Sequence, residues 1–221
     1  MENNKIAVVF NKTASHSVDP QKGFTFLCPD ELPVPDGENI VDELNGQNEL
    51  AVFRTVSKET HTTNAIWIAT PEAPQFTPIK GENVDIRWKS HCISGTKGSE
   101  LLDGLLKMPE YDFIVAKGFE PDLHPYTSCY HDLKKNISTG LIEWYNANGV
   151  TTIIVGGLAT NYCVGETVID LANAGFQIIL NLGACRGIGT EKEIDSYVDM
   201  LVEKYGILVV NSFNDIELIL E

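Results

Sequence analysis

A continuous run of β-branched and apolar residues in the second half of the chain most constrains its fold. Residues 151–155 read Thr-Thr-Ile-Ile-Val, without the polar alternation of a strand that has one face in water. Such a run is typical of a strand buried on both faces, as in a parallel sheet covered by helices. A glycine-rich turn and a segment with helical spacing follow it. Repeated units of this kind indicate a parallel sheet with right-handed crossovers.

Strands and helices are predicted to alternate through the rest of the second half. The other expected strands there are residues 111–116, 176–181 and 207–211. The expected helices are residues 135–147, 163–174, Glu191–Tyr205 and 214–220. Thr190 is a suitable N-cap for the third of these helices. The pattern predicts an α/β protein with three layers, α/β/α, around a mainly parallel central sheet.

The first half of the chain is less regular. Strands are expected at residues 5–10 and 50–56, with a short helix near residues 39–44. Residues 57–98 form a long stretch rich in Thr, Pro and Gly, and such a stretch inside a compact domain is usually functional or disordered. No linker or repeat divides the sequence, so we expect a single domain over residues 1–221.

Charge and cysteine content narrow the classes of function. The chain has 31 acidic and 16 basic residues, a net charge of −15, which disfavours nucleic acid and anionic membrane surfaces as partners. It contains no run of 18 apolar residues, so no membrane-spanning helix is expected. The five cysteines are widely spaced, without a Cys-x-x-Cys pair. This spacing argues against a disulfide framework and a zinc ribbon, and indicates reduced thiols in a cytoplasmic protein.

Three residues with catalytic chemistry follow expected strands. Asp19 follows the first strand, Lys117 follows residues 111–116, and Cys163 follows residues 151–155 after a turn of small residues. Ligands of parallel α/β sheets bind beyond the carboxyl ends of the strands, so these side chains are expected to meet. At the start of a helix, unpaired N–H groups and the helix dipole would lower the pKa of the Cys163 thiol and stabilise an oxyanion.

These residues suggest a thiol nucleophile assisted by a carboxylate and an amine. Asp19 could take the thiol proton and deliver it to a leaving amine, while Lys117 holds charge near both. Each residue also has an ordinary alternative role. Asp19 could be a turn residue before proline, Lys117 a solvated strand end, and Cys163 a small packing residue.

The motifs resemble those of nicotinamidases and the wider isochorismatase-like family of cysteine hydrolases. The resemblance rests on five stretches: Asp19-Pro-Gln-Lys-Gly-Phe24, Leu32-Pro-Val-Pro-Asp-Gly37, Trp88-Lys-Ser-His91 through Gly98, Lys117-Gly, and Gly156-Gly-Leu-Ala-Thr-Asn-Tyr-Cys163-Val. They occur in the family's order, and the resemblance extends over nearly the whole chain. It implies the isochorismatase-like fold.

The resemblance also implies a division of roles among the residues. The implied catalytic triad is Asp19, Lys117 and Cys163, and the nucleophile would form a thioester and release ammonia. The implied oxyanion hole consists of the N–H groups of Ala159 and Cys163, with a cis peptide before Ala159. The implied contacts to the substrate ring come from Phe24 and Trp88, with Tyr126 nearby.

A metal site is implied with two departures from the family pattern. The stretch Ser57-Lys-Glu59-Thr-His61-Thr-Thr-Asn-Ala65 has Glu59 where the family usually has aspartate, and Ala65 where it has a second histidine. The implied ligands are Glu59, His61 and His91, a set that suits one divalent ion such as zinc, iron or manganese. Glu82 or Asp85 could add a fourth ligand. The alternative is that Glu59 and His61 are surface residues and no metal binds.

The leading hypothesis is therefore an amidohydrolase that converts nicotinamide to nicotinate and ammonia. Two alternatives remain, a hydrolase of another small amide and a non-catalytic binding module on this fold. The expected partner is a small-molecule amide, and self-association into a homo-oligomer is left open.

The remaining histidines are expected at the surface: His16, His124 and His131. The remaining cysteines are expected to be structural: Cys28, Cys92, Cys129 and Cys185. The stretch 11–17, between the first expected strand and Asp19, is interpreted as an insertion.

Overall fold

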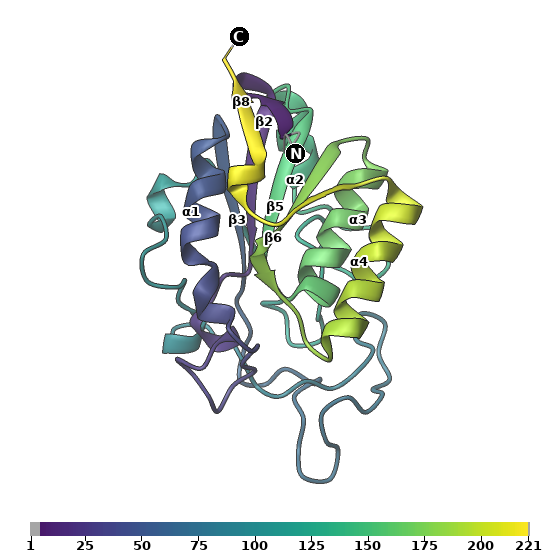
Figure 1. The fold of residues 1–221 in the computed structure, drawn as a ribbon. Helices are drawn as coiled ribbons and strands as arrows, with labels where there is room; N and C mark the ends of the chain where they lie inside the picture. The colour runs from purple at the N-terminus through teal and green to yellow at the C-terminus, as the bar shows by residue number, and fades with distance from the viewer. Residues whose placement is uncertain (1–4, 221) are drawn as a thin grey trace.

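The central feature of the fold is a six-stranded parallel sheet (Figure 1). The computed structural model describes residues 5–220. The strands of the sheet are β2 (Thr13–Val18), β3 (Phe53–Glu59), β4 (Phe113–Lys117), β5 (Thr152–Leu158), β6 (Gln177–Arg186) and β7 (Leu208–Val210). Their order across the sheet is β4-β3-β2-β5-β6-β7, with every neighbouring pair parallel. The predicted parallel sheet is confirmed.

Helices cover both faces of this sheet. They are α1 (Val41–Glu49), α2 (Leu141–Ala147), α3 (Gly165–Asn173) and α4 (Glu191–Tyr205). Figure 1 shows α1 on one side of the sheet and α3 and α4 on the other. The buried side chains divide accordingly, because Ile153 and Val155 of β5 pack with α2, α3 and α4, whereas Leu158 packs with Leu44 of α1. The three-layer α/β/α arrangement predicted from the sequence is confirmed.

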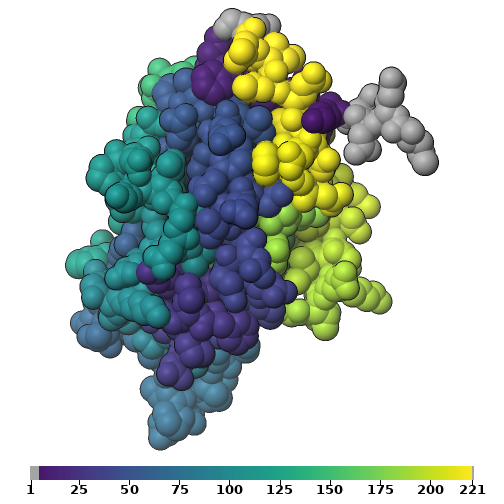
Figure 2. All heavy atoms as spheres, turned by 60° about the vertical axis from the view of Figure 1, so that its left-hand side comes forward, coloured from purple at the N-terminus to yellow at the C-terminus, as the bar shows by residue number. Residues whose placement is uncertain are grey.

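Short helical turns join these elements. They are Phe10–Lys12, Lys22–Phe24, Gly37–Ile40, Lys97–Ser99, Met108–Glu110, Thr160–Val164 and Phe213–Asp215. The long stretch from residue 60 to residue 112 contains isolated bridges and brief turns but no strand or α-helix. Its blue-teal part forms the loop that projects farthest at the lower end of Figures 1 and 2. No helix within residues 5–220 has the length and apolar character to cross a membrane.

The interpretation of residues 11–17 as an insertion is wrong. Most of them form β2, a central strand between β3 and β5. The apolar pattern misses β2 because its sequence, Thr-Ala-Ser-His-Ser-Val, carries small and polar residues that are nevertheless buried. Hydrogen bonds replace apolar contacts there. Ser15 donates to Asn48, and His16 Nδ1 lies 2.8 Å from Thr55 Oγ1.

The first expected strand is present as β1 (Ile6–Val9), but it lies outside the central sheet. It pairs in parallel with β8 (Ile216–Ile219), so the helix expected at residues 214–220 is wrong. Ile216 pairs with Ile6 and is buried against the sheet. This pairing joins opposite ends of the sequence, and a local pattern of apolar residues cannot reveal such a contact.

Helix boundaries follow the sequence where local signals are strong. The bounds of α4 are those expected, and the Thr190 side chain accepts a hydrogen bond from the Glu193 N–H as its N-cap. By contrast, α2 begins at Leu141 instead of residue 135, because Gly140 has a left-handed backbone with φ of 86°. The expected helix 163–174 likewise begins at Gly165, after the turn Thr160–Val164.

Candidate active site and metal centre

Four neighbouring strands bring ionisable or nucleophilic side chains to one point at the carboxyl edge of the sheet. Lys117 is the last residue of β4, and Glu59 is the last residue of β3. Asp19 directly follows β2, and Cys163 lies in the turn after β5. Strands β4, β3, β2 and β5 are adjacent in this order, so the four side chains converge. All four are at most 6% exposed.

Lys117 is at the centre of the predicted triad. Its Nζ lies 2.8 Å from Asp19 Oδ2 and 3.4 Å from Cys163 Sγ. It also donates to the carbonyl oxygens of Pro125 and Tyr126, at 3.2 and 2.9 Å. The fully buried ammonium is therefore surrounded by acceptors, and it joins the carboxylate to the thiol. Asp19, Lys117 and Cys163 lie together, as the sequence predicts.

The Asp19 carboxylate is held in place from the neighbouring strand. Its backbone is left-handed with φ of 43°, a conformation that aspartate tolerates better than most residues. The Asp19 N–H donates to the Ser57 carbonyl at 3.1 Å, and Ser57 Oγ donates to Asp19 Oδ1 at 2.7 Å. A carboxylate oxygen of Asp19 lies within 4.8 Å of Cys163 Sγ. Asp19 is therefore near enough to exchange a proton with the thiol after a small adjustment.

The turn that carries Cys163 depends on glycine. Gly157 has φ of 139°, and a Cβ atom there would collide with the Val18 carbonyl oxygen of β2. One residue further on, the Leu158-Ala159 peptide bond is cis, as the family resemblance implies. Cys163 lies in the turn that precedes α3, two residues ahead of Gly165.

The expectation of a lowered thiol pKa is wrong. Burial raises the pKa of the Cys163 thiol well above its usual value, and Lys117 opposes this effect only in part. Burial also raises the pKa of Asp19, against the attraction of Lys117. Burial alone would lower the pKa of Lys117, but Asp19, Cys163 and Glu59 together raise it well above its ordinary range. The resting site therefore holds a protonated thiol beside a charged lysine.

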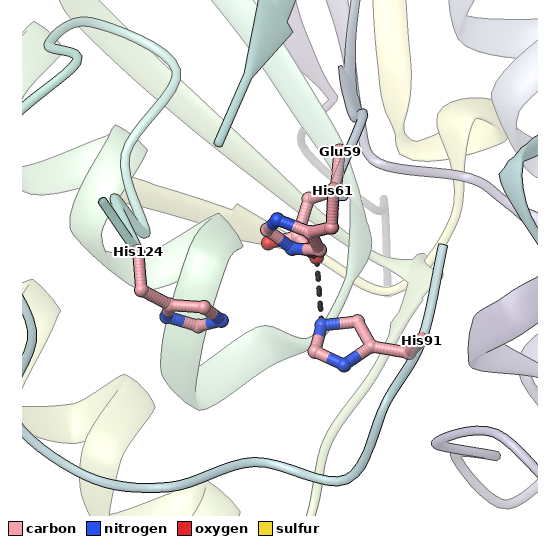
Figure 3. A group of neighbouring side chains, drawn as sticks. All are labelled: Glu59, His61, His91 and His124. Carbon is pink, nitrogen blue, oxygen red and sulfur yellow. Dashed lines mark hydrogen bonds and ion pairs between the residues drawn. The ribbon is translucent and has the colours of Figure 1, made fainter. Parts of the chain in front are cut away.

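Glu59 connects this triad to a group of histidines (Figure 3). Its Oε1 accepts a hydrogen bond from Lys117 Nζ at 3.1 Å. Its Oε2 lies 2.9 Å from Nε2 of both His61 and His91. Burial raises the pKa of Glu59, but Lys117 and His61 bring it well below its usual value. The backbone of Glu59 is fixed by Gln21, whose side chain accepts from the Glu59 N–H and donates to its carbonyl.

The histidine tautomers fit a cation at this point. His61 Nδ1 lies 2.9 Å from the Gly118 carbonyl, and His91 Nδ1 lies 2.6 Å from the Lys89 carbonyl. Because a carbonyl only accepts, each Nδ1 carries a proton. Each Nε2 then either carries a second proton or faces the Glu59 carboxylate with a lone pair. A divalent ion among the three side chains satisfies all of these lone pairs, so the set fits a metal.

A small pocket opens beside the thiol, which is part of its lining. Most of its lining is aromatic or aliphatic: Phe24, Leu32, Trp88, Tyr126, Ala159, Tyr162 and Ile188. Trp88 Nε1 donates to the Tyr126 hydroxyl, which in turn donates to Asp85. An apolar pocket with few polar groups suits a small, flat substrate. The predicted substrate contacts Phe24, Trp88 and Tyr126 thus lie in one pocket with the thiol.

Two histidines that were expected at the surface are buried. His124 and His16 are 2% and 0% exposed, so the expectation that they lie at the surface is wrong. His124 lines the pocket, and burial lowers its pKa well below the usual value. His16 is a buried residue of β2, within the central sheet. Neither position carries a local signal, because each depends on contacts between segments far apart in the sequence.

The two acidic residues considered as a fourth metal ligand have other partners. Glu82 forms an exposed ion pair with Lys134, and Asp85 accepts from Tyr126. Among residues 5–220, neither belongs to a group of potential ligand atoms that contains Glu59 and the histidines. The structure therefore leaves Glu82 and Asp85 out of the candidate metal centre.

Known proteins share both the sequence pattern and the fold. A model of the Isochorismatase domain matches residues 13–209. The nicotinamidase of Acinetobacter baylyi is 29% identical over 181 residues, which cover 80% of this chain and 83% of that protein.

Two solved structures extend the comparison. A nicotinamidase/pyrazinamidase of Acinetobacter baumanii has a TM-score of 0.82 and 26% identity, covering 93% of this chain and 98% of the other. The pyrazinamidase of Pyrococcus horikoshii in complex with zinc has a TM-score of 0.69 and 25% identity, covering 90% of this chain and 98% of the other. Because the family model spans most of its length, this chain belongs to the isochorismatase family.

Proposed function

We propose that this protein is an amidohydrolase that converts nicotinamide and water to nicotinate and ammonia. The observation that carries the proposal is the convergence of Asp19, Lys117 and Cys163 at the base of an aromatic pocket. The similarity to nicotinamidases over most of the chain supports the choice of substrate.

The residues suggest the following sequence of steps. Asp19 takes the proton of the Cys163 thiol, and the sulfur attacks the carboxamide carbon. Lys117 favours this transfer, because its charge stabilises the thiolate that forms. The backbone N–H groups of Ala159 and Cys163 are the proposed donors to the oxyanion. Asp19 then returns the proton to the leaving nitrogen, ammonia departs, and a thioester to Cys163 remains.

A water molecule completes the reaction. Asp19 is again a carboxylate once ammonia has left, so it can accept a proton from the attacking water. Attack on the thioester carbon breaks the C–S bond and releases nicotinate. The proton held by Asp19 returns to the sulfur, which restores the resting thiol.

The pocket supports a planar aromatic amide as substrate. Phe24 and Trp88 are the proposed contacts to the ring, with Tyr126 at the pocket wall. The Trp88 ring is held by Tyr162 at a centroid distance of 5.0 Å and by its hydrogen bond to Tyr126. Cys163 lines the same pocket, so a carboxamide on the bound ring would be within reach of the thiol.

Glu59, His61 and His91 are the proposed ligands of one divalent ion: zinc, iron or manganese. A carboxylate with two imidazoles suits these ions and does not choose among them. When bound, the ion would supply a Lewis acid that holds the pyridine nitrogen of the substrate. The chemistry of the amide itself is assigned to Cys163 and Asp19.

Exchange of single cysteines tests the nucleophile. We expect Cys163→Ala to reduce ammonia release from nicotinamide to background while the protein still folds. The matched control is Cys129→Ala, because Cys129 is also a buried thiol but packs in the core outside the pocket. Retention of wild-type turnover by folded Cys163→Ala would disprove the nucleophile assignment.

A panel of substrates tests the choice of amide. Ammonia release should be most efficient with nicotinamide and pyrazinamide, and weaker with benzamide and aliphatic amides. Preference for an aliphatic amide, with Cys163 still required, would instead favour a hydrolase of another small amide. Absence of turnover with every amide, together with an unreactive thiol, would favour a non-catalytic binding module.

A further inference from the structure

His124 is a buried imidazole without a protein partner. It lies in the loop that follows β4, with 2% of its surface exposed. Among residues 5–220, neither Nδ1 nor Nε2 of His124 has a hydrogen-bond partner. Buried polar side chains in native proteins nearly always have a partner, so an imidazole with two free nitrogens needs an explanation.

The ring is directed at the group around Glu59. Figure 3 shows the His124 ring facing the side chains of Glu59, His61 and His91. One ligand atom from each of these four residues lies within 4.8 Å of the others. His124 stacks on His61 with ring centroids 5.3 Å apart and an angle of 14° between the planes.

Neighbouring aromatic rings fix the orientation of His124. The Trp67 ring meets it edge to face at a centroid distance of 4.5 Å, and Trp88 stacks on it at 6.0 Å. The segment that carries His124 is also anchored, because Lys117 donates to the carbonyls of the next two residues, Pro125 and Tyr126. A side chain held in this way favours metal binding, since a mobile ligand would lose entropy when the ion binds.

We infer that His124 is a fourth protein ligand of the divalent ion assigned to Glu59, His61 and His91. This inference rests on the metal site given under the proposed function. It assigns the site three imidazoles and one carboxylate, a set that favours zinc, iron or cobalt over magnesium or calcium. Ala65 offers no donor atom, so the third imidazole comes from a separate segment of the chain.

Zinc binding to metal-free protein tests this inference without any measurement of activity. His124→Phe keeps a flat ring and removes both nitrogens. Loss of a residue that only orients a ligand costs about 10–100-fold in metal affinity, so we expect His124→Phe to bind zinc at least about 100-fold more weakly. The zinc dissociation constant is measured by competition with a chromogenic chelator. The visible absorption of cobalt-substituted protein, which reports the ligand set, should also change.

Two further variants locate the cause of any effect. His131→Phe is the matched control, because His131 is outside the group of potential ligands and should leave zinc affinity unchanged. His61→Phe removes a ligand of the site as first proposed, and should weaken zinc binding as well. If His124→Phe does not fold, His124→Gln serves in its place, with folding checked by circular dichroism.

The outcomes separate the inference from the metal site on which it rests. Wild-type zinc affinity and an unchanged cobalt spectrum in a folded His124 variant, with binding lost in His61→Phe, would overturn the role of His124 alone. A higher Michaelis constant for nicotinamide at unchanged zinc affinity would assign His124 to the substrate and also overturn the inference. Failure of the wild-type protein to bind zinc or cobalt would overturn both the inference and the metal site.

Discussion

Because His16 is buried in a neutral form, we predict that the free energy of unfolding falls measurably in mild acid. The side chain is fully buried in β2, where Nδ1 pairs with Thr55 Oγ1. Burial, reinforced by the charge of Lys117, lowers the pKa of His16 from 6.5 to about 3. The folded protein therefore keeps this ring neutral at a pH where the unfolded chain protonates it.

The size and sign of the effect follow from this difference. As the pH falls from 6.5 toward about 3, the unfolded state binds a proton that the folded state does not, so stability declines through this window. Between about pH 7 and about pH 4.5, the unfolded imidazole passes about 2 pH units below its pKa. At about 1.4 kcal/mol per unit, His16 should remove roughly 3 kcal/mol from the free energy of unfolding.

The assay compares urea denaturation at these two pH values in wild-type protein and His16→Gln. Glutamine can still hydrogen-bond Thr55 but does not titrate, so the wild type should lose roughly 3 kcal/mol more than the variant. The carboxylates contribute equally to the pH dependence of stability in both proteins. Their contribution therefore cancels when the loss in the variant is subtracted from the loss in the wild type. His131→Gln is the control, since His131 is only partly buried. If wild type and His16→Gln lost the same free energy of unfolding between these pH values, His16 would not be held neutral by the fold.

Two more predictions concern the candidate site. Asp19→Asn should lower kcat for nicotinamide by about 10²–10⁴, because the amide cannot accept the thiol proton, and steady-state ammonia release measures this loss. A fall of less than about threefold would reduce Asp19 to a turn residue. Removal of metal by a chelator should raise KM for nicotinamide more than for benzamide, which lacks the ring nitrogen. Protein with less than about a tenth of an equivalent of transition metal and undiminished turnover would contradict the metal assignment.

The fold could be predicted where the signal was local. The strand around residues 151–155 and helix α4 carry strong patterns, so both were found close to their actual bounds. Strand β2 was missed because its buried residues are Thr, Ser and His, which have no apolar periodicity. Strand β8 was missed because it exists through its pairing with β1 at the other end of the sequence.

The sequence likewise predicts some residues of the candidate site and not others. The rule that ligands bind at the carboxyl edge of a parallel sheet was enough to bring Asp19, Lys117 and Cys163 together. It could not place His124, whose position depends on how Lys117 anchors the following loop. The pKa of Cys163 was misjudged because burial, which is invisible in the sequence, outweighs the nearby positive charge.

Other expectations from the sequence stay predictions. They are the single domain over residues 1–221, the cytoplasmic location and self-association into a homo-oligomer. The roles of Phe24, Trp88 and Tyr126 toward a substrate also stay predictions, although all three line the pocket.

The two oxygens of the Glu59 carboxylate contact different neighbours, so the lysine side and the histidine side of the site are energetically coupled. One oxygen is within hydrogen-bond reach of Lys117, and the other of His61 and His91. A substitution on either side releases an oxygen that the opposite side also depends on. Effects of changes to the lysine and to the histidines should therefore not be additive, as is usual for residues that share a partner. Redesign of the pocket for another amide would have to treat both halves as one unit.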